Sequence, residues 1–385
     1  MNCVVCGNDN WRAIPNPAKD RAVTTSGIII TNTLAKSQCM TCGFVAQTGS
    51  EFLAKTDYYE QRYVDYYRRP GTAVYDVHRY VAMANWMKDA LGDFQPKTVL
   101  DVGCGAGSSM VEVKKAYTSA EIEGIEPSIE NGGIARHRGF NVQTFKVGEG
   151  RSSEKKYDLI YSHNVFTHVN DPTAFLFGLK EMLADGGRIV QLTADSTTPS
   201  NELLWCDNNY SYLPIHLVKL AEKAGLVALR YEENPYDVTI LNKQIVVFAK
   251  EGRADSTIEK LRAKKINVGE LFNRRATYMA DWMKTNNDLR EEISAYSRVV
   301  NFGASMWTWL LAGCCPDYWS RVDFCTVEGF SGRCVDRDVI AFADVEWKRA
   351  DCLVLGVNPL NQDKLKARFD EQPFHVITWN DRVRI

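Results

Sequence analysis

The stretch that decides the fold is residues 97–107, which read KTVLDVGCGAG. Its first half is apolar and rich in β-branched residues, as a strand that is buried on both faces requires. Its last five residues carry glycine at every other position, where the backbone can turn sharply and come close to a ligand. The pattern predicts a buried strand, a ligand-binding turn and a helix that begins at Ser108 or Ser109, both of which are good N-caps.

A strand followed by G-x-G-x-G resembles the S-adenosylmethionine (SAM) methyltransferases of the doubly wound α/β class, although dinucleotide-binding folds use similar turns. The next expected strand, residues 121–125, is followed by Glu126, 23 residues after Gly103. An acidic residue about 20 residues after the turn is suited to accept both hydroxyl hydrogens of a ribose. The alternative for Glu126 is a solvated carboxylate before a helix. The residues expected to bind SAM are Asp101, Gly103, Cys104, Gly105, Gly107, Glu126, Pro127 and Asn164.

Length and charge limit the classes of protein to consider. A chain of 385 residues suggests two to four domains, because a domain commonly has about 100–200 residues. The net charge of −2 provides no overall basic field for nucleic acid or an anionic membrane. No apolar run approaches the roughly 18 residues that span a bilayer, and the first residues do not resemble a signal peptide. We therefore expect a cytoplasmic protein without membrane partners.

Four of the eleven cysteines form two C-x-x-C-Gly motifs, Cys3 with Cys6 and Cys39 with Cys42. Two such knuckles supply four thiolates, which suits a structural zinc ion without an open coordination position. A redox disulfide is the alternative. Cys104 lies in the glycine turn, and the other six cysteines are expected to be buried as small hydrophobic residues.

Further polar residues follow the expected fourth strand at residues 157–163. Ligands of open α/β sheets lie at the carboxyl ends of strands, so His163, Asn164 and His168 are expected near the methyl donor. A helix should begin at Asp171-Pro172 and end at residues 185–187. The other expected elements of this domain are helices at 77–91 and 215–224, strands at 141–145 and 188–193, and an antiparallel edge pair at 227–231 and 244–249. The tyrosine-rich segment 58–69 is either a connector or a contributor of hydroxyls to the substrate site.

The last third of the chain predicts a second, smaller α/β domain. A charged helical stretch at 257–297 precedes a second strand-turn-helix pattern at 297–305, and strands are expected at 322–326, 351–357 and 375–379. The turn contains only Gly303, so it is either a structural turn or a second dinucleotide site. We expect a zinc-binding module at residues 1–70, a SAM methyltransferase domain at 71–252 and a Rossmann-like α/β domain at 253–385.

This order of parts, with the loop Asn164–Asp171 and the turn Phe302–Ser305, is similar to the three-domain sugar C-methyltransferases of deoxysugar biosynthesis. That resemblance implies methylation of the carbon beside the ketone of a nucleotide-linked 4-keto-6-deoxy sugar, held between the SAM domain and the C-terminal domain. It implies a small-molecule partner and no nucleic acid. The sequence leaves monomer and homodimer open.

One segment departs from that family, which carries a Tyr-His-Glu-His stretch where this chain has residues 205–212, WCDNNYSY. C-methylation beside a ketone needs a base for the α-proton and a group that stabilises the enolate. Asp207 could be the base, helped by Tyr210 or Tyr212, or a histidine could reach in from elsewhere. The candidate histidines are His163, His168 and His216.

If no base is present, O- or N-methylation becomes the better reaction, because a lone pair on oxygen or nitrogen attacks the methyl group directly. Two other classes remain as alternatives. One is a nucleic-acid methyltransferase that reads RNA with its zinc module, and the other is a SAM-binding scaffold without turnover.

Overall fold

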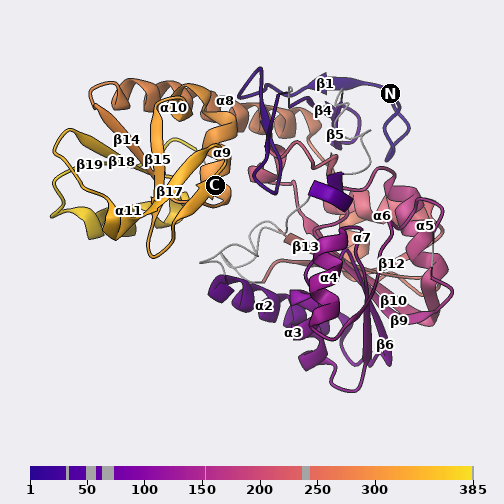
Figure 1. The fold of residues 1–385 in the computed structure, drawn as a ribbon. Helices are drawn as coiled ribbons and strands as arrows, with labels where there is room; N and C mark the ends of the chain where they lie inside the picture. The colour runs from indigo at the N-terminus through magenta and orange to yellow at the C-terminus, as the bar shows by residue number, and fades with distance from the viewer. Residues whose placement is uncertain (32–33, 49–57, 63–72, 152, 236–242, 384–385) are drawn as a thin grey trace.

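The computed structural model describes residues 1–31, 34–48, 58–62, 73–151, 153–235 and 243–383. Two α/β sheets lie at opposite sides of the molecule, and the N-terminal strands lie beside the helix that joins them (Figure 1). The predicted mixed α/β class with a Rossmann-like parallel sheet is confirmed.

The larger sheet has seven strands in the order β12-β13-β10-β9-β6-β7-β8. Five strands from β10 to β8 run parallel, whereas β13 is antiparallel to both of its neighbours, as expected for the edge pair. The strands are β6 (Thr98–Val102), β7 (Glu121–Ile125), β8 (Asn141–Gln143), β9 (Tyr157–His163), β10 (Leu183–Ala194), β12 (Val227–Glu233) and β13 (Lys243–Ala249).

Helices cover both faces of this sheet because its strands are apolar on both sides. Leu100 and Val102 face a core built with α5 (Pro172–Met182), α6 (Pro214–Lys223) and α7 (Ser256–Ala263). Val99 faces the opposite core. The helices of that core are α2 (Ala73–Leu91), α3 (Ser108–Ala116) and α4 (Ile129–His137).

The N-terminal segment forms a small sheet in the order β1-β4-β5-β11. Its strands are β1 (Trp11–Ala13), β4 (Lys36–Cys39), β5 (Val45–Gln47) and β11 (Tyr210–Ser211). The strand β11 comes from the long loop after β10. A strand from the expected methyltransferase domain therefore completes the sheet of the expected zinc-binding module. A boundary near residue 70 therefore does not separate two independently built units.

A second N-terminal element reaches the C-terminal domain. The strands β2 (Ala22–Val23) and β3 (Ile29–Ile30) form a hairpin that packs on α9 (Met306–Cys314). The turn of the hairpin has Gly27 at φ 76°, where a Cβ atom would lie 2.5 Å from the ring of Trp309. The hairpin therefore needs glycine at this contact.

The C-terminal sheet has the order β16-β17-β15-β14-β18-β19 and is parallel except for β16. The long helix α8 (Val268–Ile293) packs on it together with α9 and α10 (Pro316–Trp319), and α11 (Gln362–Lys366) follows β18. The hairpin of β16 and β17 was not expected from the sequence. The strands are β14 (Arg298–Phe302), β15 (Val322–Val327), β16 (Gly332–Cys334), β17 (Arg337–Ala341), β18 (Asp351–Leu355) and β19 (His375–Ile377).

The second glycine turn is filled by protein atoms. A Cβ atom on Gly303 would lie 2.5 Å from the backbone oxygen of Gly356. The buried Asn301 side chain donates to the Gly303 oxygen and to Thr308 Oγ1, both at 3.0 Å. This packing favours the structural reading of the turn.

Arg275 of α8 ties the three parts together. Its buried guanidinium donates to Gln38 Oε1 and the Gly43 oxygen at 2.7 Å, and to the Ser196 oxygen at 3.0 Å. These partners belong to the N-terminal sheet and to the segment after β10. This buried cation therefore fixes α8 against the N-terminal sheet and against the segment that follows β10.

Two local expectations differ from the structure. The helix α3 begins at Ser108 with Gly107 as its N-cap, so neither serine caps it. The helix α5 ends at Met182 and β10 begins at Leu183, so residues 185–187 lie in the strand instead of ending the helix.

Across the described residues, no helix combines the length and apolarity needed to span a bilayer.

Candidate active site

A cavity of about 230 Å³ opens at the carboxyl ends of β6, β7 and β9. The turn at Gly103–Gly105 and the pair Glu126–Pro127 line one part of it, and residues 163–165 and His168 line another. Tyr58 and Tyr59 of the short π-helix η1 (Tyr58–Arg62) lie against it. Ligands of doubly wound sheets bind at this place, so the sequence-predicted turn and the histidine loop meet in one cavity.

The glycine turn is tight because its backbone conformation and its neighbours exclude side chains. Gly103 has φ 77°, and a Cβ atom there would lie 2.2 Å from Cγ2 of Val165. Gly107 has φ 80°, and a Cβ atom would lie 3.1 Å from Ala135. Gly107 is absent from the cavity wall among the described residues, so its role is to start α3 close to α4.

Glu126 closes β7 beside this turn and is 5% exposed. Its two carboxylate oxygens each accept a backbone N–H at 2.8 Å, one from Gly105 and one from Ser128. A carboxylate can accept about four hydrogen bonds, so this geometry is compatible with binding hydroxyls as well. The two backbone bonds fix the carboxylate at the edge of the cavity.

Asp101 lies beneath the turn and is 1% exposed. Burial raises its pKa to about 6, while hydrogen bonds from Ser109 and Tyr161 act in the opposite direction. Ser109 Oγ lies at 2.5 Å and Tyr161 Oη at 2.7 Å from Oδ2. The neighbouring Cys104 is buried and has a raised pKa, also chiefly from burial, so it is a poor nucleophile.

His163 and Asn164 end β9 next to two cations. Arg79 Nη2 lies 3.5 Å from His163 Nε2, and Lys243 Nζ donates to Asn164 Oδ1. Burial, followed by the charges of Arg79 and Lys243, holds the pKa of His163 well below its usual range. Burial and the charge of Arg79 lower the pKa of Lys243 to about 7. A histidine in this setting is neutral and a weak base.

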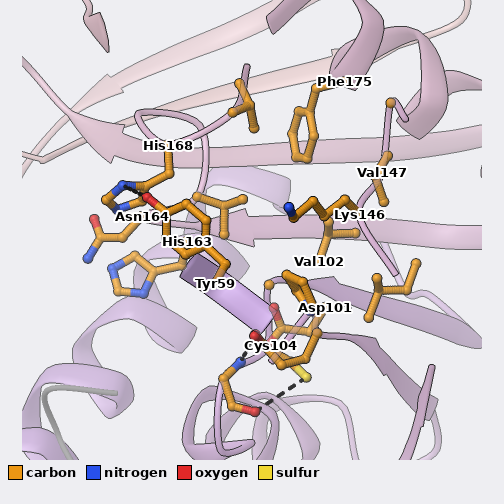
Figure 2. A pocket seen from close by; sticks show the side chains of 18 of the residues that line it. Tyr59, Asp101, Val102, Cys104, Lys146, Val147, His163, Asn164, His168 and Phe175 are labelled. Carbon is orange, nitrogen blue, oxygen red and sulfur yellow. Dashed lines mark hydrogen bonds between the residues drawn. The ribbon is translucent and has the colours of Figure 1, made fainter. Parts of the chain in front are cut away.

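His168 has a different environment, which determines its tautomer. Its Nδ1 lies 2.7 Å from the backbone oxygen of Asp207 and 2.9 Å from Tyr59 Oη, and Tyr59 Oη lies 3.2 Å from the same backbone oxygen. A carbonyl oxygen only accepts, so Nδ1 must carry the hydrogen. The lone pair of the neutral ring is therefore on Nε2. Figure 2 shows His168 and Tyr59 together on one side of the cavity, with His163 and Asn164 nearby.

The other candidate bases lie outside the cavity. Asp207 is 0% exposed, and its carboxylate accepts from Thr25 N at 2.9 Å and Thr25 Oγ1 at 2.6 Å. Tyr212 is buried and donates to the Phe166 oxygen at 3.1 Å. These contacts are structural, so the expectation that the Asp207 carboxylate and Tyr212 face the substrate does not match the geometry.

His216 and Tyr210 are also used elsewhere. His216 accepts from the Leu213 N–H at Nδ1 and faces the Cys42 oxygen at 2.9 Å with Nε2, so both ring nitrogens are engaged. Burial lowers its pKa to about 3. Tyr210 donates to the Asn170 oxygen at 2.8 Å.

Sequence reasoning missed Arg79 and Lys243 and did not single out Tyr59 within its tyrosine-rich segment. Arg79 lies in an amphipathic helix where a single cation has no distinguishing pattern. Lys243 begins β13, which lies between β12 and β10, and is far from the motifs along the chain. The parallel pairing of β9 with β10 and the antiparallel pairing of β10 with β13 bring Lys243 beside Asn164.

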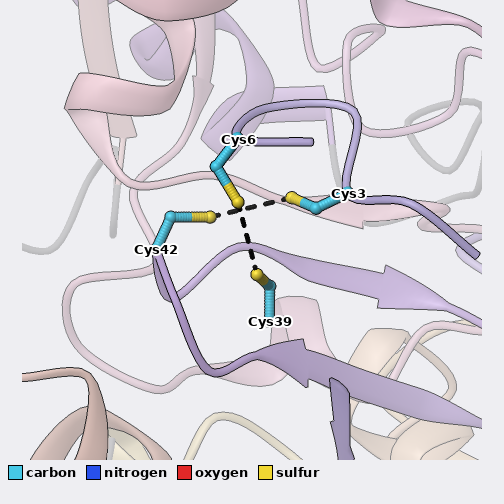
Figure 3. A group of neighbouring side chains, drawn as sticks. All are labelled: Cys3, Cys6, Cys39 and Cys42. Carbon is cyan, nitrogen blue, oxygen red and sulfur yellow. Dashed lines mark hydrogen bonds between the residues drawn. The ribbon is translucent and has the colours of Figure 1, made fainter. Parts of the chain in front are cut away.

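The four motif cysteines converge, as Figure 3 shows. The Sγ atoms of Cys3 and Cys42 are 3.7 Å apart, those of Cys6 and Cys39 are 3.6 Å apart, and all four lie within 4.8 Å of one another. A tetrahedral zinc with Zn–S bonds of about 2.3 Å places its sulfurs about 3.8 Å apart. The cluster therefore has the ligand set and the spacing of a structural zinc site.

Residues 75–231 match the family described as "Methyltransferase domain". This part of the chain is a SAM-dependent methyltransferase domain. The cavity lies within it, between the glycine turn and the end of β9.

Known proteins similar to this domain act on different acceptors by name. The chain is 25% identical over 165 residues to a ubiquinone biosynthesis O-methyltransferase of Aeromonas salmonicida, covering 37% of this chain and 68% of that protein. It is 26% identical over 218 residues to a tRNA U34 carboxymethyltransferase of Shewanella oneidensis, covering 53% and 66%. For two other curated relatives the matched part is only 40% and 36% of their length.

A solved methyltransferase, CcbJ from Streptomyces caelestis, matches this structure with 16% identity and a TM-score of 0.38, covering 50% of this chain and 97% of the other.

Proposed function

We propose that the protein transfers the methyl group of SAM to a small molecule, by C-methylation of a nucleotide-linked keto sugar. The observation that carries the proposal is that the glycine turn, Glu126 and His168 line the same cavity. SAM supplies an electrophilic methyl group. In the chain, Glu126 binds the ribose of SAM and the glycine turn contacts its amino-acid part. The chain also orients the acceptor, which can lower the activation barrier by about 7–11 kcal/mol.

The base of this reaction is proposed to be His168. Its Nδ1–H is held by the Asp207 oxygen, and its Nε2 takes the proton from the carbon beside the ketone. Catalytic bases are commonly oriented by a hydrogen bond with another group, and the Asp207 backbone oxygen has that role here. It replaces the His/Glu pair of the sugar C-methyltransferases, and Asp207 contributes as a positioning residue through its backbone oxygen.

The keto-sugar class comes from the resemblance of the three-part chain to the sugar C-methyltransferases, and the four-cysteine cluster and the second α/β sheet support it. O- or N-methylation is the second candidate, since His168 could equally take a proton from a hydroxyl. In both versions the partner is a small molecule.

A nucleic-acid acceptor is a third candidate, motivated by the Shewanella relative, which acts on tRNA by name. A net charge of −2 argues against it, because nucleic-acid binding draws most of its affinity from phosphate contacts with basic residues.

The zinc ion is proposed to be structural. Four thiolates complete its coordination, and the buried His216 links the Cys42 knuckle to α6. The ion would therefore hold the N-terminal sheet against the methyltransferase domain.

The test is to incubate the protein with SAM labelled at the methyl carbon and a panel of nucleotide-linked keto sugars, and to locate the new methyl by NMR. A methyl on the carbon beside the ketone supports the proposal. A methyl on oxygen or nitrogen selects the second candidate, and transfer to tRNA alone overturns both.

A further inference from the structure

A second group of polar residues lines the cavity beside the proposed base. Arg79, His163, Asn164 and Lys243 meet at the end of β9, and we call this group the β9 corner. Arg79, His163 and Asn164 line the cavity, and Lys243 holds Asn164 from behind. The proposed base does not use any of these four residues.

The contacts within the β9 corner fix which hydrogen-bonding atoms remain for a ligand. Guanidinium is only a donor, so its contact with His163 Nε2 makes that nitrogen the acceptor and places the hydrogen on Nδ1. Ammonium is also only a donor, so Lys243 takes the oxygen of the Asn164 amide and leaves the amide NH₂. His163 and Asn164 therefore offer N–H donors to the cavity.

Positive charge lies behind these donors. Burial is the largest cause of the lowered pKa of His163, and the charges of Arg79 and Lys243 lower it further. Burial and then Arg79 lower the pKa of Lys243, while Glu202 acts in the opposite direction. Such mutual effects report like charges held close together in a poorly solvated place. Binding an anion there would be favoured by the same charges.

The backbone supports a functional role for this position. Asn164 has φ 57°, in the left-handed region that only Asn164 and Val335 occupy among the described residues other than glycine. Residues in this region concentrate at ligand sites, and asparagine tolerates it better than most side chains. The strained turn directs β9 so that His163 and Asn164 both reach the cavity.

We propose that the β9 corner binds a planar oxygen anion of the methyl acceptor, either a carboxylate or an enolate oxygen. Asn164, His163 and Arg79 are the direct donors, and Lys243 orients Asn164. For a ketone, the α C–H bond breaks, the proton goes to His168 Nε2, and the electron pair delocalises onto the oxygen held here. This inference rests on the proposed function, because it places the acceptor in the same cavity.

The test measures binding of two simple anions to the full chain saturated with S-adenosylhomocysteine, by calorimetry at pH 6.5. Oxalate is a planar mimic of an enolate, and acetate is a carboxylate alone. Saturable binding of at least one is expected, and Asn164→Asp and Lys243→Met should each weaken it by at least tenfold. Asn164→Asp retains a residue that tolerates positive φ. The matched control Lys88→Met removes an exposed cation from α2 and should leave anion binding unchanged.

Oxalate binding without acetate binding indicates an enolate oxygen, and similar binding of both indicates a carboxylate. The proposal is overturned if neither anion binds to the wild type, or if both variants bind the anions as the wild type does. Failure of the proposed function has a different signature, namely methyl transfer to tRNA alone in the labelling assay, or a wild type that does not bind S-adenosylhomocysteine.

Discussion

Asp207 holds His168 through its backbone oxygen, 2.7 Å from Nδ1, while its carboxylate is held in turn by Thr25. Thr25 lies in the turn between β2 and β3. The N-terminal segment therefore sets the position of the loop that orients the proposed base. This gives the N-terminal hairpin a role in the active site without contact with a substrate.

Replacing His168 by glutamine should lower turnover by about 10²–10⁴-fold, the usual contribution of a positioned base. The affinity for S-adenosylhomocysteine should stay within about twofold, since the ribose grip lies at Glu126. Exchange of the α-proton of a keto sugar in D₂O, followed by NMR, should disappear in parallel. The control His137→Gln changes an exposed histidine of α4, and equal exchange in the His168 variant would show that another group is the base.

Asp207→Asn tests whether this carboxylate is a base or an anchor. The substituted amide can place an N–H against the N–H of Thr25, which should reduce the free energy of unfolding by about 1–3 kcal/mol. Turnover should fall only modestly, and the pH dependence of kcat/KM should keep its shape because the backbone oxygen remains. Denaturant unfolding and a pH profile check this, and loss of the acidic limb of the profile would return Asp207 to the role of base.

Glu126→Ala should weaken binding of S-adenosylhomocysteine by at least tenfold, because it removes the proposed ribose acceptor and the anchor of Gly105 N. Each charge-assisted hydrogen bond that is lost is worth about 1.5–3 kcal/mol. Calorimetry measures this affinity, and the exposed Glu154→Ala serves as the control. Unchanged affinity in the Glu126 variant would remove Glu126 from the cofactor site.

The sequence was sufficient for those parts of the fold that local patterns determine. Residues 97–107 predicted β6, its turn and α3, and Asp171-Pro172 predicted the start of α5, because strand composition, glycine spacing and helix caps act over a few residues. The antiparallel pair of β12 and β13 followed from its apolar runs and their place after the fifth strand.

The remaining parts depend on contacts between distant segments. The sequence suggested Asp207 as a base because it lies in the segment that replaces the Tyr-His-Glu-His motif of the family. Its hydrogen-bond partner Thr25 is 182 residues away in the sequence, so no local pattern could indicate the contact. The strand β11 is two residues long and pairs with β5, so no periodicity could indicate it. The pair of Lys243 with Asn164 likewise exists only through the sheet order.

Metal analysis should find about one zinc ion per chain. Cys39→Ser should remove the zinc ion and lower the melting temperature, because Cys39 lies in the core shared by the N-terminal sheet and the methyltransferase domain. The control Cys314→Ala changes a buried cysteine of α9 and should leave the zinc content unchanged. Zinc-free protein that melts at the same temperature as the metal-loaded protein would contradict a structural role.

Asp101→Asn should stabilise the protein in a pH-dependent way. Burial raises the folded-state pKa of Asp101 to about 6 from its ordinary value of 3.8, so the folded state favours the protonated carboxyl. That contribution is complete below about pH 3.8 and is lost as the pH rises through about 6. At pH 7.5 the buried carboxylate therefore costs up to about 3 kcal/mol, at about 1.4 kcal/mol per pKa unit.

The Asp101→Asn side chain avoids this cost and keeps an oxygen that can accept from Ser109 and Tyr161. We expect the free energy of unfolding at pH 7.5 to rise by about 1–3 kcal/mol and the gain to vanish near pH 4. Denaturant titrations at pH 4, 5.5 and 7.5 measure the difference, with the exposed Asp93→Asn as the matched control. A gain that is equal at all three pH values would mean that folding does not shift the pKa of Asp101, and a loss at pH 7.5 would mean that its charged form is stabilised.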